Sequence, residues 1–64
     1  MTTGEKVRAY RMREKASQED LAHKIGITSV SFGMKERGEC PWKLTEVVTL
    51  AKEFNIDINE LIGE

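Results

Sequence analysis

The amino-acid sequence predicts an all-α fold, a compact domain of five short helices, from three observations. Apolar residues recur at the three- and four-residue spacing of helices nearly throughout, and no strand-like alternation is sustained. Capping residues and helix-ending glycines divide this pattern into segments. A chain of 64 residues builds one small core. We therefore predict a single domain over residues 1–64, with helices at about 4–15, 18–25, 29–37, 44–54 and 58–62.

The first two predicted helices are separated by a helix-start signal. The first, over residues 4–15, rests on its apolar spacing. In the segment Ser17-Gln-Glu-Asp20, the Ser17 hydroxyl can accept a hydrogen bond from the Asp20 backbone N–H, and the Asp20 carboxylate favours the positive end of a helix. The second helix then runs over residues 18–25 and ends at Gly26, because glycine adopts the left-handed conformation at little cost.

The third predicted helix, residues 29–37, lies between an N-cap and a glycine. Thr28 is a suitable N-cap, and Gly38 ends the helix. The residues that follow are predicted to form a loop, since Pro41 cannot continue a helix.

The last two predicted helices follow a pronounced apolar stripe. The stripe of the fourth helix, residues 44–54, consists of Leu44, Val47, Val48, Leu50, Ala51 and Phe54. Asn55 is a tolerable left-handed terminator. The segment Asp57-Ile-Asn-Glu60 resembles a second capping box and predicts a short fifth helix over residues 58–62.

Composition excludes several classes of function. Hydrophobic residues make up 39% of the chain and charged residues 33%, a globular balance, and no apolar run approaches the roughly 20 residues of a membrane span. The single Cys40 and single His23 exclude an intramolecular disulfide and a zinc site built from Cys and His. No pair of carboxylates is placed for acid–base catalysis. We expect no catalytic residue, no metal, no cofactor, no membrane partner, and a cytoplasmic location.

The distribution of charge matters more than the net charge of −1. Residues 1–38 carry eight basic and five acidic side chains, whereas residues 39–64 carry two basic and six acidic ones. A local field acts over about one Debye length, roughly 8–10 Å, so a basic face can attract phosphate although the whole chain is acidic.

Residues 18–38 combine two short helices with a tight turn. Four positions must be apolar to hold these helices on the core: Leu21, Ile25, Ile27 and Phe32. Ala22 must be small because the second helix of the pair crosses above it, and Gly26 must adopt a positive φ in the turn. This arrangement is a helix-turn-helix, whose second helix can be presented to the major groove of DNA.

The chain resembles a phage-repressor domain of the lambda repressor and Cro type over nearly its whole length. The matching segments are Ser17-Gln18, Asp20-Leu21-Ala22, Ile25-Gly26-Ile27-Thr28, Glu36-Arg37-Gly38, the apolar run from Leu44 to Phe54, and Ile56-Asp57-Ile58-Asn59-Glu60-Leu61. The resemblance implies a lambda-repressor-like helix-turn-helix domain. It also implies a bacterial or phage-encoded, sequence-specific transcriptional regulator that places its recognition helix in the major groove of double-stranded DNA.

The resemblance also implies roles for particular residues. Gln18, Arg37 and Lys43 would contact the phosphate backbone of DNA. The outward face of the third helix would read base edges through Thr28, Ser29, Val30, Gly33 and Met34, with Ser31 as a further candidate. Arg11 and Glu36 would form a structural salt bridge between the first and third helices.

The predicted reading face lacks the side chains that usually discriminate bases, namely Arg, Lys, Asn and Gln. Val30 could contact a thymine methyl group. An alternative function is therefore a protein-interaction module, either a repressor modulator or an antitoxin-like partner, with Val30 and Met34 as apolar contacts to another regulatory protein. Lys35 falls where relatives place an apolar side chain, and we expect its stem to pack while its amine points outward.

A weak homodimer is expected, because relatives bind two half-sites about 34 Å apart as two-fold dimers. The predicted dimer contact consists of Trp42, Leu44, Ile56 and Ile58. For Trp42, a lid over the core between the third and fourth helices is an equally good interpretation.

Overall fold

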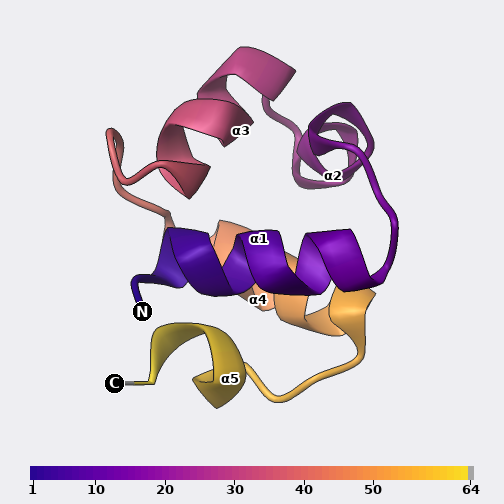
Figure 1. The fold of residues 1–64 in the computed structure, drawn as a ribbon, viewed down its shortest axis with the longest axis vertical. Helices are drawn as coiled ribbons and strands as arrows, with labels where there is room; N and C mark the ends of the chain where they lie inside the picture. The colour runs from indigo at the N-terminus through magenta and orange to yellow at the C-terminus, as the bar shows by residue number, and fades with distance from the viewer. Residues whose placement is uncertain (64) are drawn as a thin grey trace.

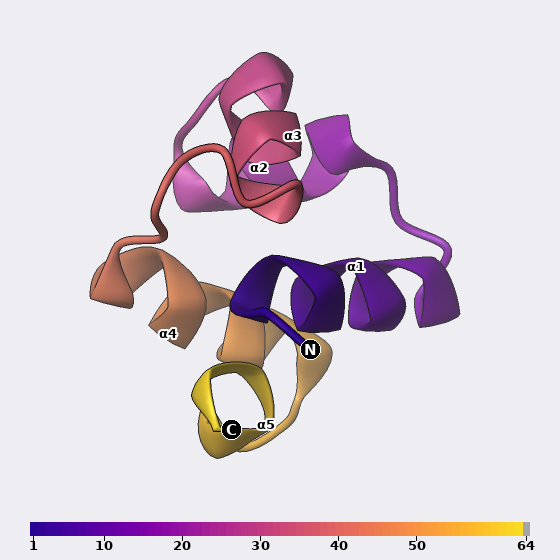
Figure 2. The ribbon, with the colours of Figure 1, turned by 60° about the vertical axis from the view of Figure 1, so that its left-hand side comes forward.

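A computed structural model describes residues 1–63 and contains five α-helices in that range, which confirms the predicted fold class. They are α1 (Thr3–Arg13), α2 (Gln18–Ile25), α3 (Ser29–Glu36), α4 (Leu44–Phe54) and α5 (Asn59–Ile62) (Figure 1). α2 and α3 lie together on one side of α1 and α4, and α5 lies on the opposite side (Figures 1 and 2). Residue 64, the last of the predicted domain, lies outside the described residues.

The helix-turn-helix forms for the local reasons that the sequence indicates. The Asp20 N–H donates to Ser17 Oγ at 3.0 Å, and the Ser17 N–H donates to Asp20 Oδ2 at 3.2 Å, so the predicted capping box is present. Gly26 follows α2 with a φ of +77°. The Ser31 N–H donates to the hydroxyl of the N-cap Thr28 at 3.1 Å and begins α3.

The predicted end of the first helix and the predicted capping box of the fifth helix are wrong. α1 ends at Arg13 rather than near residue 15, because Lys15 adopts a left-handed φ of +57° that an α-helix cannot contain. The capping box expected at the start of α5 does not form. The Asp57 carboxylate accepts from the Asn59 N–H at 2.8 Å, and the Glu60 backbone N–H donates to the Asp57 backbone oxygen at 2.9 Å instead of to the Asp57 side chain. Ile58 is already in the right-handed helical region and is the N-cap of α5.

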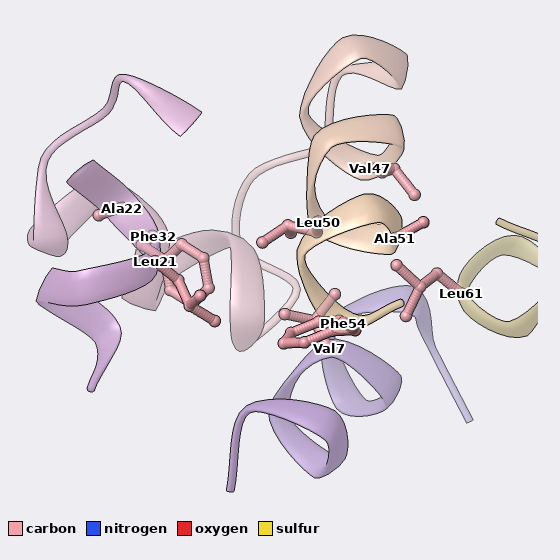
Figure 3. Close-up of a cluster of buried hydrophobic side chains, with 9 residues drawn as sticks. All are labelled: Val7, Leu21, Ala22, Phe32, Val47, Leu50, Ala51, Phe54 and Leu61. Carbon is pink, nitrogen blue, oxygen red and sulfur yellow. The ribbon is translucent and has the colours of Figure 1, made fainter. Parts of the chain in front are cut away.

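The core collects apolar side chains from all five helices. Its buried members are Val7, Leu21, Ala22, Phe32, Val47, Leu50, Ala51, Phe54 and Leu61. Leu21 and Phe32 extend from the helix-turn-helix toward α4 (Figure 3). Because these two side chains are buried, the opposite face of α3 is the one left to solvent. No helix within residues 1–63 is long and apolar enough to cross a membrane.

A close backbone approach joins α1 to the last turn of α3. Gly4, in the first turn of α1, is buried, and a Cβ added there would lie 2.7 Å from the Lys35 carbonyl oxygen and closer still to that of Glu36. The first turn of α1 thus touches the carbonyl end of α3, where the partial charges of the two helix ends are opposite. Glycine at position 4 permits this contact, which fixes α3 relative to α1.

Candidate nucleic-acid interface

The exposed surface of α3 begins at its N-terminus. Thr28, Ser29 and Val30 are exposed, and Val30 retains 72% of its accessible surface. The first turn of α3 contains no acidic residue, so the positive end of the helix dipole is not neutralised by a carboxylate within that turn. This end of the helix favours anionic groups.

Lys35 does not present its amine to solvent, which corrects the expectation for this residue. Its Nζ lies 2.6 Å from both carboxylate oxygens of Glu46, and both residues are buried. Burial alone would raise the pKa of Glu46, but hydrogen bonds from Lys35 and from the Lys43 backbone N–H outweigh burial and hold that pKa below its usual value. The amine points inward because a carboxylate from α4 is available there.

A second ion pair joins α1 to α3. Arg11 Nε lies 2.7 Å from Glu36 Oε2, and Arg11 Nη2 donates to Glu36 Oε1 at 3.2 Å. Arg11 Nη1 also donates to the Ala16 carbonyl, and Gln18 Nε2 donates to Glu36 Oε1 at 3.0 Å. The pair is thus structural, and it also holds the Gln18 side chain against the end of α3.

Gly33 is not part of the exposed face, contrary to the prediction. It is buried, and a Cβ added there would lie 3.2 Å from Arg37 Nη1 and 3.3 Å from Gln18 Oε1. The Gln18 and Arg37 side chains therefore converge over the gap that the missing side chain leaves. Arg37 Nε also lies 2.8 Å from Glu39 Oε2, and both side chains of this pair are more than half exposed.

The remaining predicted DNA contacts divide between α3 and the loop before α4. Ser31 and Met34 are half-buried on α3. Lys43 is exposed and is the N-cap of α4. A groove of about 290 Å³ is lined by Arg8 and Arg37 together with Thr2, Glu5 and Glu36.

The residues of the predicted dimer contact have two kinds of environment. Leu44 is 67% exposed. Trp42, Ile56 and Ile58 are half-buried against the core, and the Trp42 ring meets Phe32 edge-on at a centroid distance of 5.5 Å. Trp42 thus covers the core between α3 and α4.

Several solved structures are similar to this chain, among them the following two. No protein-family model and no curated protein sequence matches the chain. The P22 c2 repressor protein, solved in complex with a synthetic operator, superposes with a TM-score of 0.87 at 25% identity, covering 98% of this chain and 96% of that chain. The restriction-modification controller protein C.AhdI from Aeromonas hydrophila superposes with a TM-score of 0.83 at 32% identity, covering 94% and 91%. The similarity therefore extends over nearly the whole of each structure.

Proposed function

Since this chain belongs to the lambda-repressor-like helix-turn-helix family, we propose that it binds double-stranded DNA as a sequence-specific transcriptional regulator of the repressor and Cro type. α3 is the recognition helix and lies in the major groove. The observation that carries the proposal is the superposition on an operator-bound repressor, together with an exposed α3 N-terminus that lacks acidic side chains.

The size and attachment of α3 suit this role. An α-helix with its side chains is about 10–12 Å in diameter, and the major groove is about 12 Å wide. The buried Lys35–Glu46 pair, the partly buried Arg11–Glu36 pair and the Gly4 contact attach the opposite face of α3 to α1 and α4. A helix held on that side can be offered to DNA at a fixed angle.

The exposed residues of α3 supply modest base readout. The Thr28, Ser29 and Ser31 hydroxyls can donate to or accept from any base, and Val30 can pack on a thymine methyl group. Met34 adds a flexible apolar contact. Specificity then rests partly on DNA shape, because hydroxyl contacts discriminate weakly among bases.

Phosphate contacts supply much of the affinity. Gln18 lies at the start of α2, within the helix-turn-helix. Lys43 lies at the start of α4, the helix that follows it. We expect both to contact the phosphate backbone, and because Lys43 is positively charged, its contact makes affinity fall as salt is raised. The protein binds two half-sites as a weak dimer, through a contact that includes the exposed Leu44 together with Trp42, Ile56 and Ile58.

The test is selection of bound fragments from random double-stranded DNA, followed by affinity measurements on the selected site. We expect one enriched motif, and we expect Val30→Ala to reduce its preference for thymine while Met34→Ala alters a neighbouring position. His23→Ala is the matched control. His23 is exposed on α2, and it lines a groove with Glu53 and Phe54 of α4 rather than the exposed surface of α3. The control should select the same motif as the unaltered protein.

Binding of equal strength to every fragment would contradict the proposal. It would instead favour the protein-interaction module, for which the 72% exposed Val30 is the natural apolar contact.

A further inference from the structure

We propose that Arg37 reads a guanine base, held by Glu39 over the gap that Gly33 leaves in the recognition helix. This role replaces the phosphate contact expected for Arg37. The inference rests on the proposed function, because it requires α3 to lie in the major groove.

The first support is that α3 itself contains no arginine or lysine whose donors are free to pair with guanine. Guanine presents two acceptors, O6 and N7, to the major groove; the planar fork of arginine matches both at once, whereas lysine offers a single point charge. Lys35 is the basic residue within α3 itself, and its amine is buried against Glu46. Arg37, the C-cap of α3, is the next basic group along the helix.

The second support is the place of the guanidinium. A side chain on a helix leans toward the N-terminus and covers the preceding turn. Arg37 follows this rule, since its Nη1 lies 3.2 Å from the Cβ position of Gly33. Gln18 Oε1 lies 3.3 Å from that position and limits the space beside the guanidinium. An arginine attached at the end of α3 thus places its donors over the middle of the helix.

The third support is the ion pair with Glu39. The Arg37 Nε–H donates to Glu39 Oε2 at 2.8 Å. This hydrogen bond raises the pKa of Arg37 and lowers that of Glu39, so both groups stay charged and the pair has no net charge. A pair without net charge attracts phosphate weakly, and its carboxylate repels phosphate. Guanine O6 and N7 are neutral acceptors, so they can accept from an arginine whose charge is already compensated.

The pairing with Glu39 also leaves two donor groups of Arg37, Nη1 and Nη2, unoccupied. It engages Nε, and among the described residues no side-chain hydrogen bond involves Nη1 or Nη2 of Arg37. Those two groups form the end of the planar fork that matches two adjacent acceptors. Glu39 therefore acts as a positioning residue that orients Arg37.

The experiment repeats the DNA selection with Arg37→Lys and Glu39→Gln and measures the salt dependence of affinity on the selected site. Arg13→Lys is the matched control, because Arg13 is also an exposed arginine paired with a neighbouring glutamate, Glu14. We expect the unaltered protein and the Arg13→Lys variant to prefer guanine at one position of each half-site. Arg37→Lys should lose that preference by about tenfold or more, with the slope of log affinity against log salt nearly unchanged.

Glu39→Gln should change the salt dependence, which Arg37→Lys leaves nearly unchanged. It leaves the Arg37 charge uncompensated, so the slope should steepen by about one while the guanine preference weakens. The inference is overturned if Arg37→Lys keeps the guanine preference, or if Arg37→Ala weakens binding to all sequences equally, as for a phosphate contact. If the unaltered protein selects no motif at all, the proposed function fails and this inference fails with it.

Discussion

The Nζ of Lys35 on α3 lies 2.6 Å from both carboxylate oxygens of Glu46 on α4, and both side chains are buried. Glu46 also accepts from the Lys43 backbone N–H at 2.9 Å, so one carboxylate satisfies both the buried lysine and the start of α4. The helix α3 is thus attached to α4 by a buried ion pair.

Removing one partner of this pair should destabilise the fold strongly. Lys35→Met leaves the Glu46 carboxylate buried without its cation, at a cost of about 3–5 kcal/mol in the free energy of unfolding. The double variant Lys35→Met with Glu46→Gln should recover much of that loss, because glutamine is uncharged and can still accept from Lys43. Urea unfolding followed by circular dichroism measures both. A double variant less stable than Lys35→Met alone would contradict this account.

The same carboxylate should make stability depend on acid pH. The pKa of Glu46 is lowered in the folded state, so its contribution is fully present above the pKa of the unfolded chain and is lost as pH falls through the folded value. We expect the stability difference between the unaltered protein and Glu46→Gln to shrink as pH falls below about 5. Urea unfolding at a series of pH values tests this. A difference that stays constant down to about pH 3 would show that the pKa is not lowered.

The two helical glycines should respond to alanine with opposite signs. Gly4→Ala should cost about 1–3 kcal/mol, because its Cβ meets the rigid backbone carbonyls of Lys35 and Glu36. Gly33→Ala should stabilise the fold by up to about 1 kcal/mol, since alanine favours helix and the neighbouring atoms are the ends of flexible side chains. Thermal unfolding of the two variants side by side gives the signs. A stabilised Gly4→Ala would rule out the close approach of α1 to α3.

Overpacking the helix-turn-helix should disrupt the fold. Ala22 is 1% exposed beneath the crossing of α2 and α3, and Ala22→Leu should cost about 1–3 kcal/mol or more. Ala9→Leu is the control, since Ala9 is exposed on α1 and its replacement should leave stability nearly unchanged. Circular dichroism and urea unfolding report both. An Ala22→Leu variant as stable as Ala9→Leu would refute the helix packing.

Self-association should depend on Leu44. Because Leu44 is 67% exposed, Leu44→Ser should leave the fold intact while weakening dimers in solution and cooperative binding to two half-sites. Met12→Ser is the control, since Met12 is an exposed apolar residue of α1 outside the proposed contact. Sedimentation velocity, with and without DNA, distinguishes the variants. Unaltered protein that stays monomeric on a two-half-site fragment would contradict the proposal.

Local signals in the sequence determined the number and type of the helices. The Ser17 and Asp20 capping box, the Thr28 cap and the left-handed Gly26 depend on neighbouring residues, and each is present as predicted. Apolar spacing likewise identified Leu21 and Phe32 as core residues. The end of α1 was less predictable, because Lys15 adopts a left-handed conformation that its residue type does not favour.

The sequence by itself therefore determined an all-α helix-turn-helix domain and the segment that forms α3, the second helix of that motif. Only the tertiary structure decided that the Lys35 amine turns inward to Glu46 and that Gly33 is covered by Gln18 and Arg37. The physical reason is distance along the chain. A helix cap and an apolar stripe are settled within a few residues, whereas the partner of a long charged side chain is set by which helix folds against it.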